Sequence, residues 1–482
     1  MRSLLKAIFL LVSCSLVFGG CGGCTSSEEE TDPIVEVGNI EVTLTSLNGS
    51  TLLQQLPENL GFSDQGNGAI INITESDKGP PIQGFGGALT GSSAFLLSGN
   101  KEALNALFAE NEEGIGLNFV RLVMGASDFN RNGNYTYNDI VEAEDPDLSE
   151  FSIANDKIAD NPVIPVAQSI LGINNNISFI ASPWTAPPWM KSSRSFIGGR
   201  LLPQYYSVYA DYFAKYIEAY AEEGIEISGI TPQNEPLHEP STYPGMLMSA
   251  SEQSEFIGNH LGPTFEMGGL LTKIIAYDHN YRVESDPEYP LKVLRDADAS
   301  RYTNAIAYHA YGGNPTDIDK VLDEFPDTEI YFTEQAGIQN EGTSFSGEIG
   351  WFMSNVFSPI MRRGGKGILL WNLALNENGG PTNNGCLTCR GVITVTGSGT
   401  VVKNPEYYLL GHFSKFVNPG ARRLITNPVS GTLENVAFEN PDGSRVIVLM
   451  NSSSSEEEIT INSRSNKINY TLPAASLATL KW

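Results

Sequence analysis

Two glutamates, Glu235 and Glu334, each stand directly behind an apolar run, where a buried strand would end. The first lies in the stretch Ile230–Pro240 (ITPQNEPLHEP), where Asn234, Glu235 and Pro236 follow a β-branched segment. Hydrolysis of a glycosidic bond with retention needs two carboxyl groups about 5 to 5.5 Å apart, one to protonate the leaving oxygen and one to attack the anomeric carbon. Two glutamates at strand ends therefore predict this chemistry, provided that the fold brings them together.

The surroundings of the two glutamates suggest different roles. We expect Glu235 to be the acid and then the base, held protonated by partial burial and by the like charge of Glu334. Glu334 would be the nucleophile that forms a glycosyl-enzyme ester. Asn234 is placed to donate to the sugar 2-hydroxyl. His309 and Tyr311 point to one side of an extended segment, which places Tyr311 to hydrogen-bond the nucleophile. A single glutamate at a strand end is more often a surface residue, so the hypothesis depends on the pair.

Eight short apolar runs could position these residues as strands. They are IQGFGGA from Ile82, LNFVRLVM from Leu117, ISFIASPW from Ile177, ISGITPQN from Ile227, LTKIIAYD from Leu271, NAIAYHAY from Asn304, EIYFTEQ from Glu329 and GILLWNLAL from Gly367. Segments with helical periodicity lie between them, most clearly from Pro203 to Gly224. In that segment one stripe holds Tyr206, Tyr209, Tyr212, Phe213 and Ile217. This alternation favours a (β/α)₈ TIM barrel over a doubly wound sheet, and it places Glu235 and Glu334 at the same mouth.

Both ends of the chain have a different pattern. They contain short β-like runs broken by Gly, Asn, Asp and Ser, including the hairpin signal NPDGS at Asn440–Ser444. We therefore assign residues 36–80 and 405–482 to one side β-sandwich and residues 81–404 to the barrel.

The first residues have the layout of an export signal. Arg2 and Lys6 precede an apolar run, and small residues precede Cys21. Residues 1–20 are interpreted as a lipoprotein signal peptide, Cys21 as the lipidated residue and residues 21–35 as an acidic, polar tether. We expect an outer-membrane lipoprotein facing the cell surface, held to the membrane only by its lipid; a secreted or periplasmic protein is the alternative.

The charge and cysteine content of the chain limit the kinds of binding partner and metal site that it could have. The formal net charge of −27 argues against nucleic acid or an anionic membrane as a partner, because a phosphate backbone needs clustered Lys and Arg. Beyond the leader, Cys386 and Cys389 form a lone C-x-x-C, which is a weak zinc signal and, in an exported chain, favours a disulfide. We predict no metal and no cofactor.

Several motifs in the same order resemble glycoside hydrolase family 30, the family of lysosomal glucosylceramidase and microbial β-1,6-glucanases. They are GFGGALT (Gly84–Thr90), RLVMGASDF (Arg121–Phe129), SPWTAPPWMK (Ser182–Lys191), TPQNEP (Thr231–Pro236), YHAYGG (Tyr308–Gly313), TEQAG (Thr333–Gly337), WNLALNENGGP (Trp371–Pro381) and GHFSKFVNPGARR (Gly411–Arg423).

The resemblance implies a barrel with a β-sandwich made from both chain ends, and it implies site residues. Glu235 resembles the family acid/base and Glu334 its nucleophile. Residues that resemble the lining of the first sugar subsite are Asn234, Trp184 and Trp371. Residues that resemble the shell around the nucleophile are Arg121, His309 and Tyr311.

One position departs from the family pattern. Where the glucosylceramidase branch has an Asp after the GGALT stretch, this chain has Gly91. Together with CLTCRGV (Cys386–Val392), this favours a β-glucan, so the leading hypothesis is a retaining hydrolase of β-1,6-glucosidic linkages.

Glucosylceramidase, β-xylosidase and β-fucosidase remain enzyme alternatives. A glycan-binding surface lipoprotein without catalysis and a purely structural surface protein are alternatives of other classes. Exo or endo action stays open.

Overall fold

The structure, a computed structural model, describes residues 40–482 except 58, 59, 64, 142, 341 and 430. Residues 1–39 lie outside the described residues. They include the predicted signal peptide (residues 1–20), the predicted lipidation site Cys21 and the predicted tether (residues 21–35). None of the described helices is long and apolar enough to cross a membrane.

Parallel strands form the predicted barrel. Its strands are β4 (Gly84–Leu89), β5 (Phe119–Met124), β6 (Ser178–Pro183), β7 (Ile227–Ile230), β8 (Lys273–Ile274), β9 (Ala276–Asn280), β10 (Ala305–His309), β11 (Glu329–Glu334) and β13 (Gly367–Leu370). The sheet order runs from β8 through β7, β6, β5, β4, β13, β11 and β10 to β9. Since only Ile275 separates β8 from β9, these two are halves of one barrel strand, and the sheet closes on itself. The eight apolar runs therefore correspond to the barrel strands.

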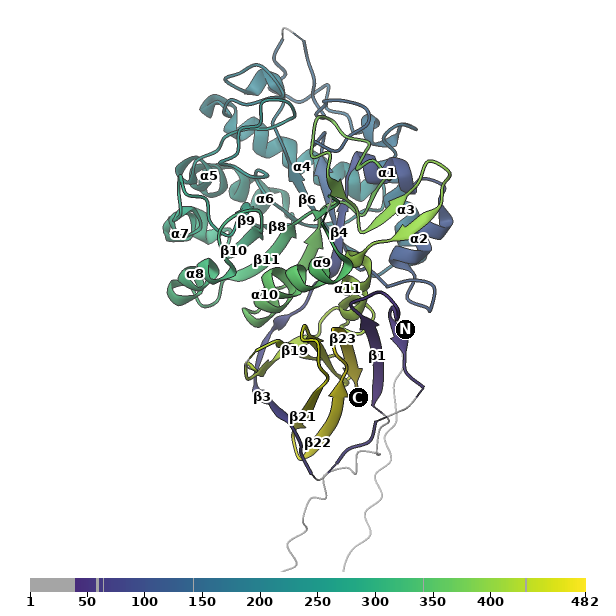
Figure 1. The fold of residues 1–482 in the computed structure, drawn as a ribbon. Coiled ribbons are helices and arrows are strands. Elements are labelled where there is room, and N and C mark those ends of the chain that lie inside the picture. The colour runs from purple at the N-terminus through teal and green to yellow at the C-terminus, as the bar shows by residue number, and fades with distance from the viewer. Residues whose placement is uncertain (1–39, 58–59, 64, 142, 341, 430) are drawn as a thin grey trace, which may run out of the picture. The chain divides into compact units, whose positions relative to one another are not determined.

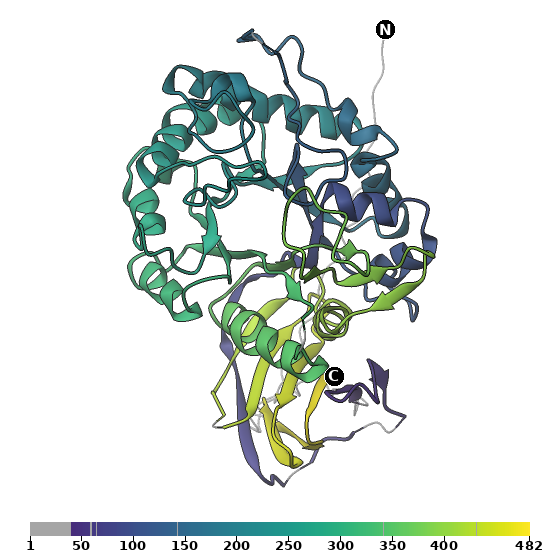
Figure 2. The same cartoon turned by 45° about the horizontal axis from the view of Figure 1, so that its top comes forward.

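Helices surround these strands (Figures 1 and 2). They are α1 (Gly91–Leu97), α2 (Lys101–Phe108), α3 (Val163–Ile173), α4 (Tyr206–Glu222), α5 (Ala250–Phe256), α6 (Gly262–Gly268), α7 (Tyr289–Arg295), α8 (Asp319–Glu324), α9 (Phe345–Phe352), α10 (Ser358–Arg362) and α11 (Pro405–Ser414). The predicted stripe of α4 is buried, since Tyr209, Tyr212 and Phe213 have no exposed surface. The stripe packs against the barrel, as its periodicity indicated.

The purple and yellow strands of Figure 1 form the second domain, the β-sandwich. They are β1 (Glu41–Ser46), β2 (Gln54–Gln55), β3 (Ala69–Pro81), β18 (Arg422–Thr426), β19 (Leu433–Glu439), β20 (Arg445–Asn451), β21 (Glu457–Ser463), β22 (Asn466–Leu472) and β23 (Ser476–Lys481). The strand β1 from one end of the chain pairs with β23 from the other, in antiparallel register from Glu41–Lys481 to Ser46–Ser476. Both chain ends therefore build one sandwich, as the sequence predicted.

One segment differs from the sequence analysis. Residues 405–414, assigned there to the sandwich, form the helix α11, whose Phe413 packs on Phe85 of β4 with ring centroids 5.4 Å apart. Buried His412 of α11 also hydrogen-bonds Thr45 of β1 and Thr479 of β23, each at 2.8 Å. The helix thus belongs to the barrel core while it anchors the sandwich. A buried helix with little amphipathic contrast has no clear period in the sequence.

Two small sheets lie among the loops that follow β11 and β13. One pairs β12 (Gly337–Ile338) with β15 (Cys389–Arg390), and the other joins β14 (Ala374–Leu375), β16 (Ile393–Val395) and β17 (Val401–Lys403). The strand β14 falls within the last predicted run, GILLWNLAL, whereas the other short strands were not predicted.

Candidate active site

The ends of the barrel strands bring Glu235 and Glu334 together. Glu334 is the last residue of β11, and Glu235 lies in the connection after β7. One carboxylate oxygen of each, and one ring nitrogen of His309, all lie within 4.8 Å of one another. Because the carboxyl ends of parallel barrel strands meet at one face, residues about a hundred positions apart converge. Such close carboxylates fit retaining hydrolysis, because inverting hydrolysis needs carboxyl groups about 6.5 to 9.5 Å apart.

Glu334 is held by two side chains that were predicted to surround it. Arg121 of β5 donates from Nη1 to its Oε2 at 2.6 Å, and the Tyr311 hydroxyl donates to its Oε1 at 3.2 Å. Burial raises the pKa of Glu334 and the charge of Glu235 adds to this, while His309 and Arg121 lower it. The guanidinium keeps its charge at every accessible pH, so it stabilises the ionised form of its partner.

Glu235 has a strained backbone and a cationic neighbour. Its φ of 44° lies in the left-handed region, where a residue with a Cβ is held only by its surroundings. Its backbone N–H donates to the carbonyl of Asp278 at 2.9 Å, and its Oε1 lies 3.1 Å from Nδ1 of His309. This backbone contact fixes the direction in which the carboxylate points.

The charges around Glu235 favour a proton on His309 rather than on Glu235. Burial raises the pKa of Glu235, but the hydrogen bond from His309 and the charge of His279 lower it to about 2. Burial lowers the pKa of His309, but the negative charges of Glu334 and Asp278 raise it to about 9. The expectation that Glu235 itself is held protonated is therefore wrong for the resting site. Instead, the pair of His309 and Glu235 shares one transferable proton.

Asp278 is the central residue that sequence reasoning missed. Its carboxylate accepts hydrogen bonds from Arg121 at 2.9 Å, from His309 at 3.1 Å, and from three hydroxyls, those of Ser182 at 2.9 Å and of Thr231 and Thr333 at 2.6 Å. Burial raises its pKa, but the charge of Arg121 outweighs this and holds the pKa far below its usual range. Asp278 fixes both the guanidinium that binds Glu334 and the imidazole that binds Glu235.

A break in the fifth barrel strand aims Asp278 inward. Tyr277 and Asp278 both have positive φ, 73° and 61°, and the register with β10 shifts at this point. Such a bulge turns a side chain that regular pleating would place elsewhere. The signal in the sequence was an acidic residue closing the apolar run LTKIIAYD, but alternation alone does not predict the bulge.

The two predicted tryptophans form one wall. The rings of Trp184 and Trp371 stack with centroids 5.0 Å apart, and both side chains are buried. The Arg121 guanidinium lies 5.0 Å from the Trp184 ring centroid. Arg121 also donates to the Asn234 side-chain oxygen at 2.6 Å, which leaves the Asn234 amide N–H groups free to face a ligand.

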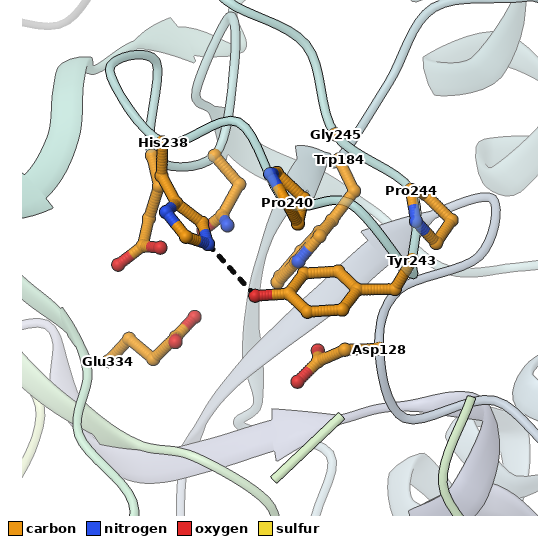
Figure 3. A pocket seen from close by; sticks show the side chains of 10 residues that line it. Asp128, Trp184, His238, Pro240, Tyr243, Pro244, Gly245 and Glu334 are labelled. Carbon is orange, nitrogen blue, oxygen red and sulfur yellow. Dashed lines mark hydrogen bonds between the residues drawn. The ribbon is translucent and has the colours of Figure 1, made fainter. Parts of the chain in front are cut away.

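A small, open pocket lies in front of Glu235 and Glu334. Trp184, Asn234, Glu235 and Glu334 line it. Trp371, Arg121, His309 and Tyr311 contact these residues without being part of the lining. The lining includes further residues that the sequence analysis did not single out: Asp128, His238, Pro240, Tyr243, Pro244 and Gly245 (Figure 3).

Asp128 adds an acidic group to this lining. Burial raises the pKa of Asp128 well above its usual range, and the charges of Glu334 and Glu235 raise it further. Asp128 lies in the RLVMGASDF motif, which the sequence analysis quoted without assigning it a role.

Glu235, His309 and Glu334 could by distance hold a metal ion. However, both nitrogens of His309 already face carboxylates, and Glu334 already accepts from Arg121. This arrangement suits proton transfer and charge stabilisation by the side chains themselves.

Comparisons with known proteins agree with this geometry. The model of the glycosyl hydrolase family 30 TIM-barrel domain matches residues 82–417, and that of the family 30 beta sandwich domain matches residues 420–480. The chain belongs to glycoside hydrolase family 30. It is therefore a glycoside hydrolase, and its substrate is a glycan.

Its relatives include endo-1,6-beta-D-glucanases and glucosylceramidases. The chain is 32% identical to the endo-1,6-beta-D-glucanase BGN16.3 of Trichoderma harzianum, over 84% of this chain and 86% of that protein. It is 31% identical to the lysosomal acid glucosylceramidase of Mus musculus, over 82% and 80%. Among solved structures, the endo-beta1,6-glucanase BT3312 superposes with a TM-score of 0.84 at 32% identity, covering 92% of this chain and 99% of that one.

Gly91, the position at which the chain differs from the glucosylceramidase pattern, does not line the pocket. Gly91 is the first residue of α1 and is buried, and it is absent from the lining. A Cβ at this position would lie 2.4 Å from the side-chain oxygen of Asn161 and 2.5 Å from that of Asn130. The glycine thus reflects packing, and the inference that Gly91 bears on the bound sugar is withdrawn. Asp128, by contrast, lines the pocket together with Glu235 and Glu334.

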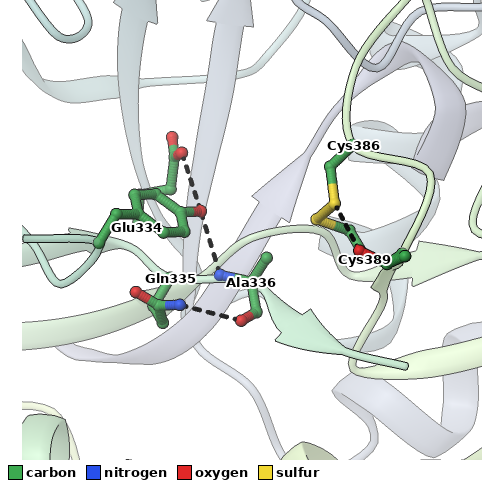
Figure 4. Close-up of a disulfide and its surroundings, with 7 residues drawn as sticks. Glu334, Gln335, Ala336, Cys386 and Cys389 are labelled. Atoms are coloured by element: carbon green, nitrogen blue, oxygen red, sulfur yellow. Dashed lines mark hydrogen bonds between the residues drawn. A yellow bond between two sulfur atoms is a disulfide. The ribbon is translucent and has the colours of Figure 1, made fainter. Parts of the chain in front are cut away.

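Cys386 and Cys389 are joined by a disulfide next to the nucleophile segment (Figure 4). The strand β15, which begins at Cys389, pairs with β12, and β12 begins three residues after Glu334. Arg390 continues this contact with a two-pronged bond to Glu406 of α11, at 2.6 and 3.0 Å. The disulfide loop thereby braces the chain that follows Glu334.

Proposed function

We propose that this family 30 enzyme hydrolyses β-1,6-glucosidic linkages of a β-glucan with retention, with Glu334 as nucleophile and Glu235 as acid/base. The substrate would be a β-1,6-glucan or the β-1,6 branches of a laminarin-type β-1,3-glucan. The observation that carries the mechanism is the approach of the two carboxylates to within 4.8 Å in one pocket. The linkage is supported by relatives that are named endo-1,6-beta-D-glucanases.

In the first step, the Glu334 carboxylate attacks the anomeric carbon while Glu235 protonates the departing glycosidic oxygen. The proton comes from the pair of His309 and Glu235. A bound sugar removes water from Glu235 and disfavours its charge, so the proton moves from Nδ1 across 3.1 Å to Oε1. His309 then remains neutral and still donates from Nε2 to Asp278.

In the second step, Glu235 takes a proton from water while the water oxygen attacks the anomeric carbon. The bond to Glu334 breaks, and the released carboxylate returns to the hydrogen bonds of Arg121 and Tyr311. Two inversions give net retention. Asn234 is proposed to hold the sugar 2-hydroxyl, and the walls of Trp184 and Tyr243 to hold the ring faces.

Digestion of a linear β-1,6-glucan and of laminarin tests this proposal. We expect reducing sugar from both, with the β-anomer appearing first in the proton NMR spectrum and no release by the Glu334→Ala variant. A monosaccharide as sole product would mean exo action, and a ladder of oligosaccharides would mean endo action. A wild-type enzyme that leaves both glucans intact would overturn the proposed substrate.

Glucosylceramide is the second candidate substrate, because the murine lysosomal enzyme is nearly as similar to this chain as the glucanases are. Hydrolysis of glucosylceramide with no action on β-1,6-glucan would favour it. A panel of aryl β-glucoside, β-xyloside and β-fucoside tests the remaining enzyme alternatives. Binding of a glucan without hydrolysis of any of these would support a non-catalytic role.

We also propose that the protein is exported as a lipoprotein. The support is the sequence alone: the charged start, the apolar run and Cys21, followed by the acidic tether. Mass spectrometry of the mature N-terminus should find a lipid on Cys21, and Cys21→Ala should remain uncleaved. A soluble mature protein without lipid would indicate simple secretion.

A further inference from the structure

One side of the pocket is formed by an irregular segment, residues 231–249, which is called the roof below. No helix longer than a single turn and no strand lies between the end of β7 at Ile230 and the start of α5 at Ala250. Tyr243, Pro244 and Gly245 of this segment line the pocket (Figure 3). Tyr243 packs against the cluster that contains Trp184, and its hydroxyl lies 3.0 Å from Nε2 of His238.

Lys191 connects this roof to the tryptophan wall. Its ammonium lies 2.6 Å from Oγ1 of Thr185, which directly follows Trp184 in the chain. It lies 2.9 Å from the carbonyl oxygen of Gly245, in the roof. Two further carbonyl oxygens accept from it, those of Ser195 at 2.9 Å and Phe196 at 3.2 Å.

The same loop binds the roof through the backbone. The N–H of Gly245 donates to the Phe196 carbonyl at 3.1 Å, and the N–H of Leu247 donates to the Gly199 carbonyl at 2.9 Å. Lys191 therefore lies at the point where the loop after β6, which carries Trp184, meets the loop after β7, which carries Tyr243.

The burial of Lys191 requires an explanation beyond packing. Its side chain has no exposed surface, and within the described part of the chain it forms no ion pair with a carboxylate. Burying an ammonium is costly, and lysine is almost never fully buried without partners. An apolar side chain of the same length would fill the space at lower cost. What an apolar side chain cannot supply is a set of N–H donors directed at both loops at once.

We propose that Lys191 is a positioning residue that fixes Tyr243 relative to Trp184 and so determines how tightly the pocket holds a sugar ring. The inference rests on the proposed function insofar as the ligand is a sugar, but it does not depend on the linkage. Lys191 does not line the pocket and acts through the roof, so its loss should weaken binding of substrate and transition state alike.

The first test is Lys191→Met, which keeps the length of the side chain and removes the donors. On the aryl β-glycoside that the wild type cleaves best, KM should rise about tenfold while kcat stays within about twofold. Binding of a glucose-like iminosugar, measured by calorimetry, should weaken by a similar factor. The control is Lys320→Met, which removes an exposed lysine paired with Asp317 and should change neither parameter.

The second test is a double-mutant cycle with Tyr243→Ala. If Lys191 acts through the roof, the double variant should lose no more than about twofold in kcat/KM beyond Tyr243→Ala alone. Two losses that multiply would mean that Lys191 acts elsewhere and would overturn the proposal. So would a folded Lys191→Met variant with an unchanged KM, or one that loses only kcat.

A milder variant covers the case in which Lys191→Met does not fold. Thr185→Val removes one acceptor from the ammonium and leaves the three carbonyls in place. We expect KM to rise about threefold at constant kcat, with the same lack of additivity toward Tyr243→Ala. Melting curves establish that each variant is folded at the assay temperature. Because these assays use aryl glycosides and an iminosugar, they remain decisive even if the wild type does not cleave β-1,6-glucan.

Discussion

The sandwich core and the barrel mouth are both buried, but they are built from opposite kinds of side chain. The sandwich core is aliphatic, with Ile447, Leu449 and Leu480 at most 1% exposed. In the barrel mouth, Arg121, Asp278 and His309 have no exposed surface, and Glu334 is 6% exposed. Aliphatic burial stabilises a fold directly, whereas buried charges are costly and are tolerated only when their geometry satisfies one another.

Because of this difference, we expect the sandwich core to determine the stability of the fold and the barrel mouth to determine catalysis. The sandwich can lose a methyl group and keep its shape, because its contacts are numerous and not directional. The mouth cannot lose a charge without changing the position or the pKa of its neighbours, because each group is held by another charged or hydrogen-bonding group. Substitutions in the two regions should therefore affect different measurements.

The largest expected effect is in the mouth, at the nucleophile. Glu334→Ala should lower kcat by at least about 10³-fold, because it removes the attacking group. Hydrolysis of an aryl β-glucoside measures this, and added azide should restore turnover as an α-glycosyl azide. The control is Glu329→Gln at the other end of β11, where Glu329 pairs with Lys273. Equal losses of kcat in both variants would contradict the role of Glu334.

The second largest effect tests whether the catalytic groups at the barrel mouth depend on the negative charge of Asp278. Asp278→Asn should lower kcat by about 10²-fold and the free energy of unfolding by about 3 kcal/mol, because Arg121 loses its buried counter-charge. Both losses in one variant would distinguish the mouth from the sandwich. Activity assays together with urea unfolding check this. A fully active Asp278→Asn enzyme would show that the network does not position the catalytic groups.

A smaller effect concerns pH. With a pKa of about 9, His309 should keep the shared proton up to that pH, so kcat/KM should fall above about pH 9. In His309→Gln, Glu235 must hold the proton alone, and the alkaline limb should move to lower pH. Because this pKa is raised above the unfolded value of about 6.5, the stability it contributes is complete below pH 6.5 and lost as the pH rises to about 9. An alkaline limb that does not move would contradict the shared proton.

The smallest effect on catalysis is expected from the sandwich. Leu480→Ala should lower the free energy of unfolding by about 2 to 5 kcal/mol, because it leaves a cavity between the sheets. At temperatures where the variant is folded, kcat and KM should equal those of the wild type. A change in kcat as large as that of Asp278→Asn would mean that the sandwich controls the site directly.

The barrel could be predicted because its information is local. Each strand is a short, mostly apolar run, and the longest helix, α4, has a periodic apolar stripe that includes Tyr209, Tyr212 and Phe213. The two glutamates were predictable for the same reason, since the end of an apolar run marks the end of a strand. The helix α11 was missed because its residues 405–414 are buried almost all round and have no contrasting face.

By itself the sequence determined the barrel, the pairing of both chain ends in one sandwich, and the convergence of Glu235 and Glu334. Only the tertiary structure decided which acidic residues surround them. Asp278 enters the site through a bulge with two positive φ angles, Asp128 and Tyr243 reach the pocket on irregular loops, and Gly91 is kept out of it by packing. These outcomes depend on contacts between segments distant in the chain, and the location of the proton depends on the sum of charges that those contacts assemble.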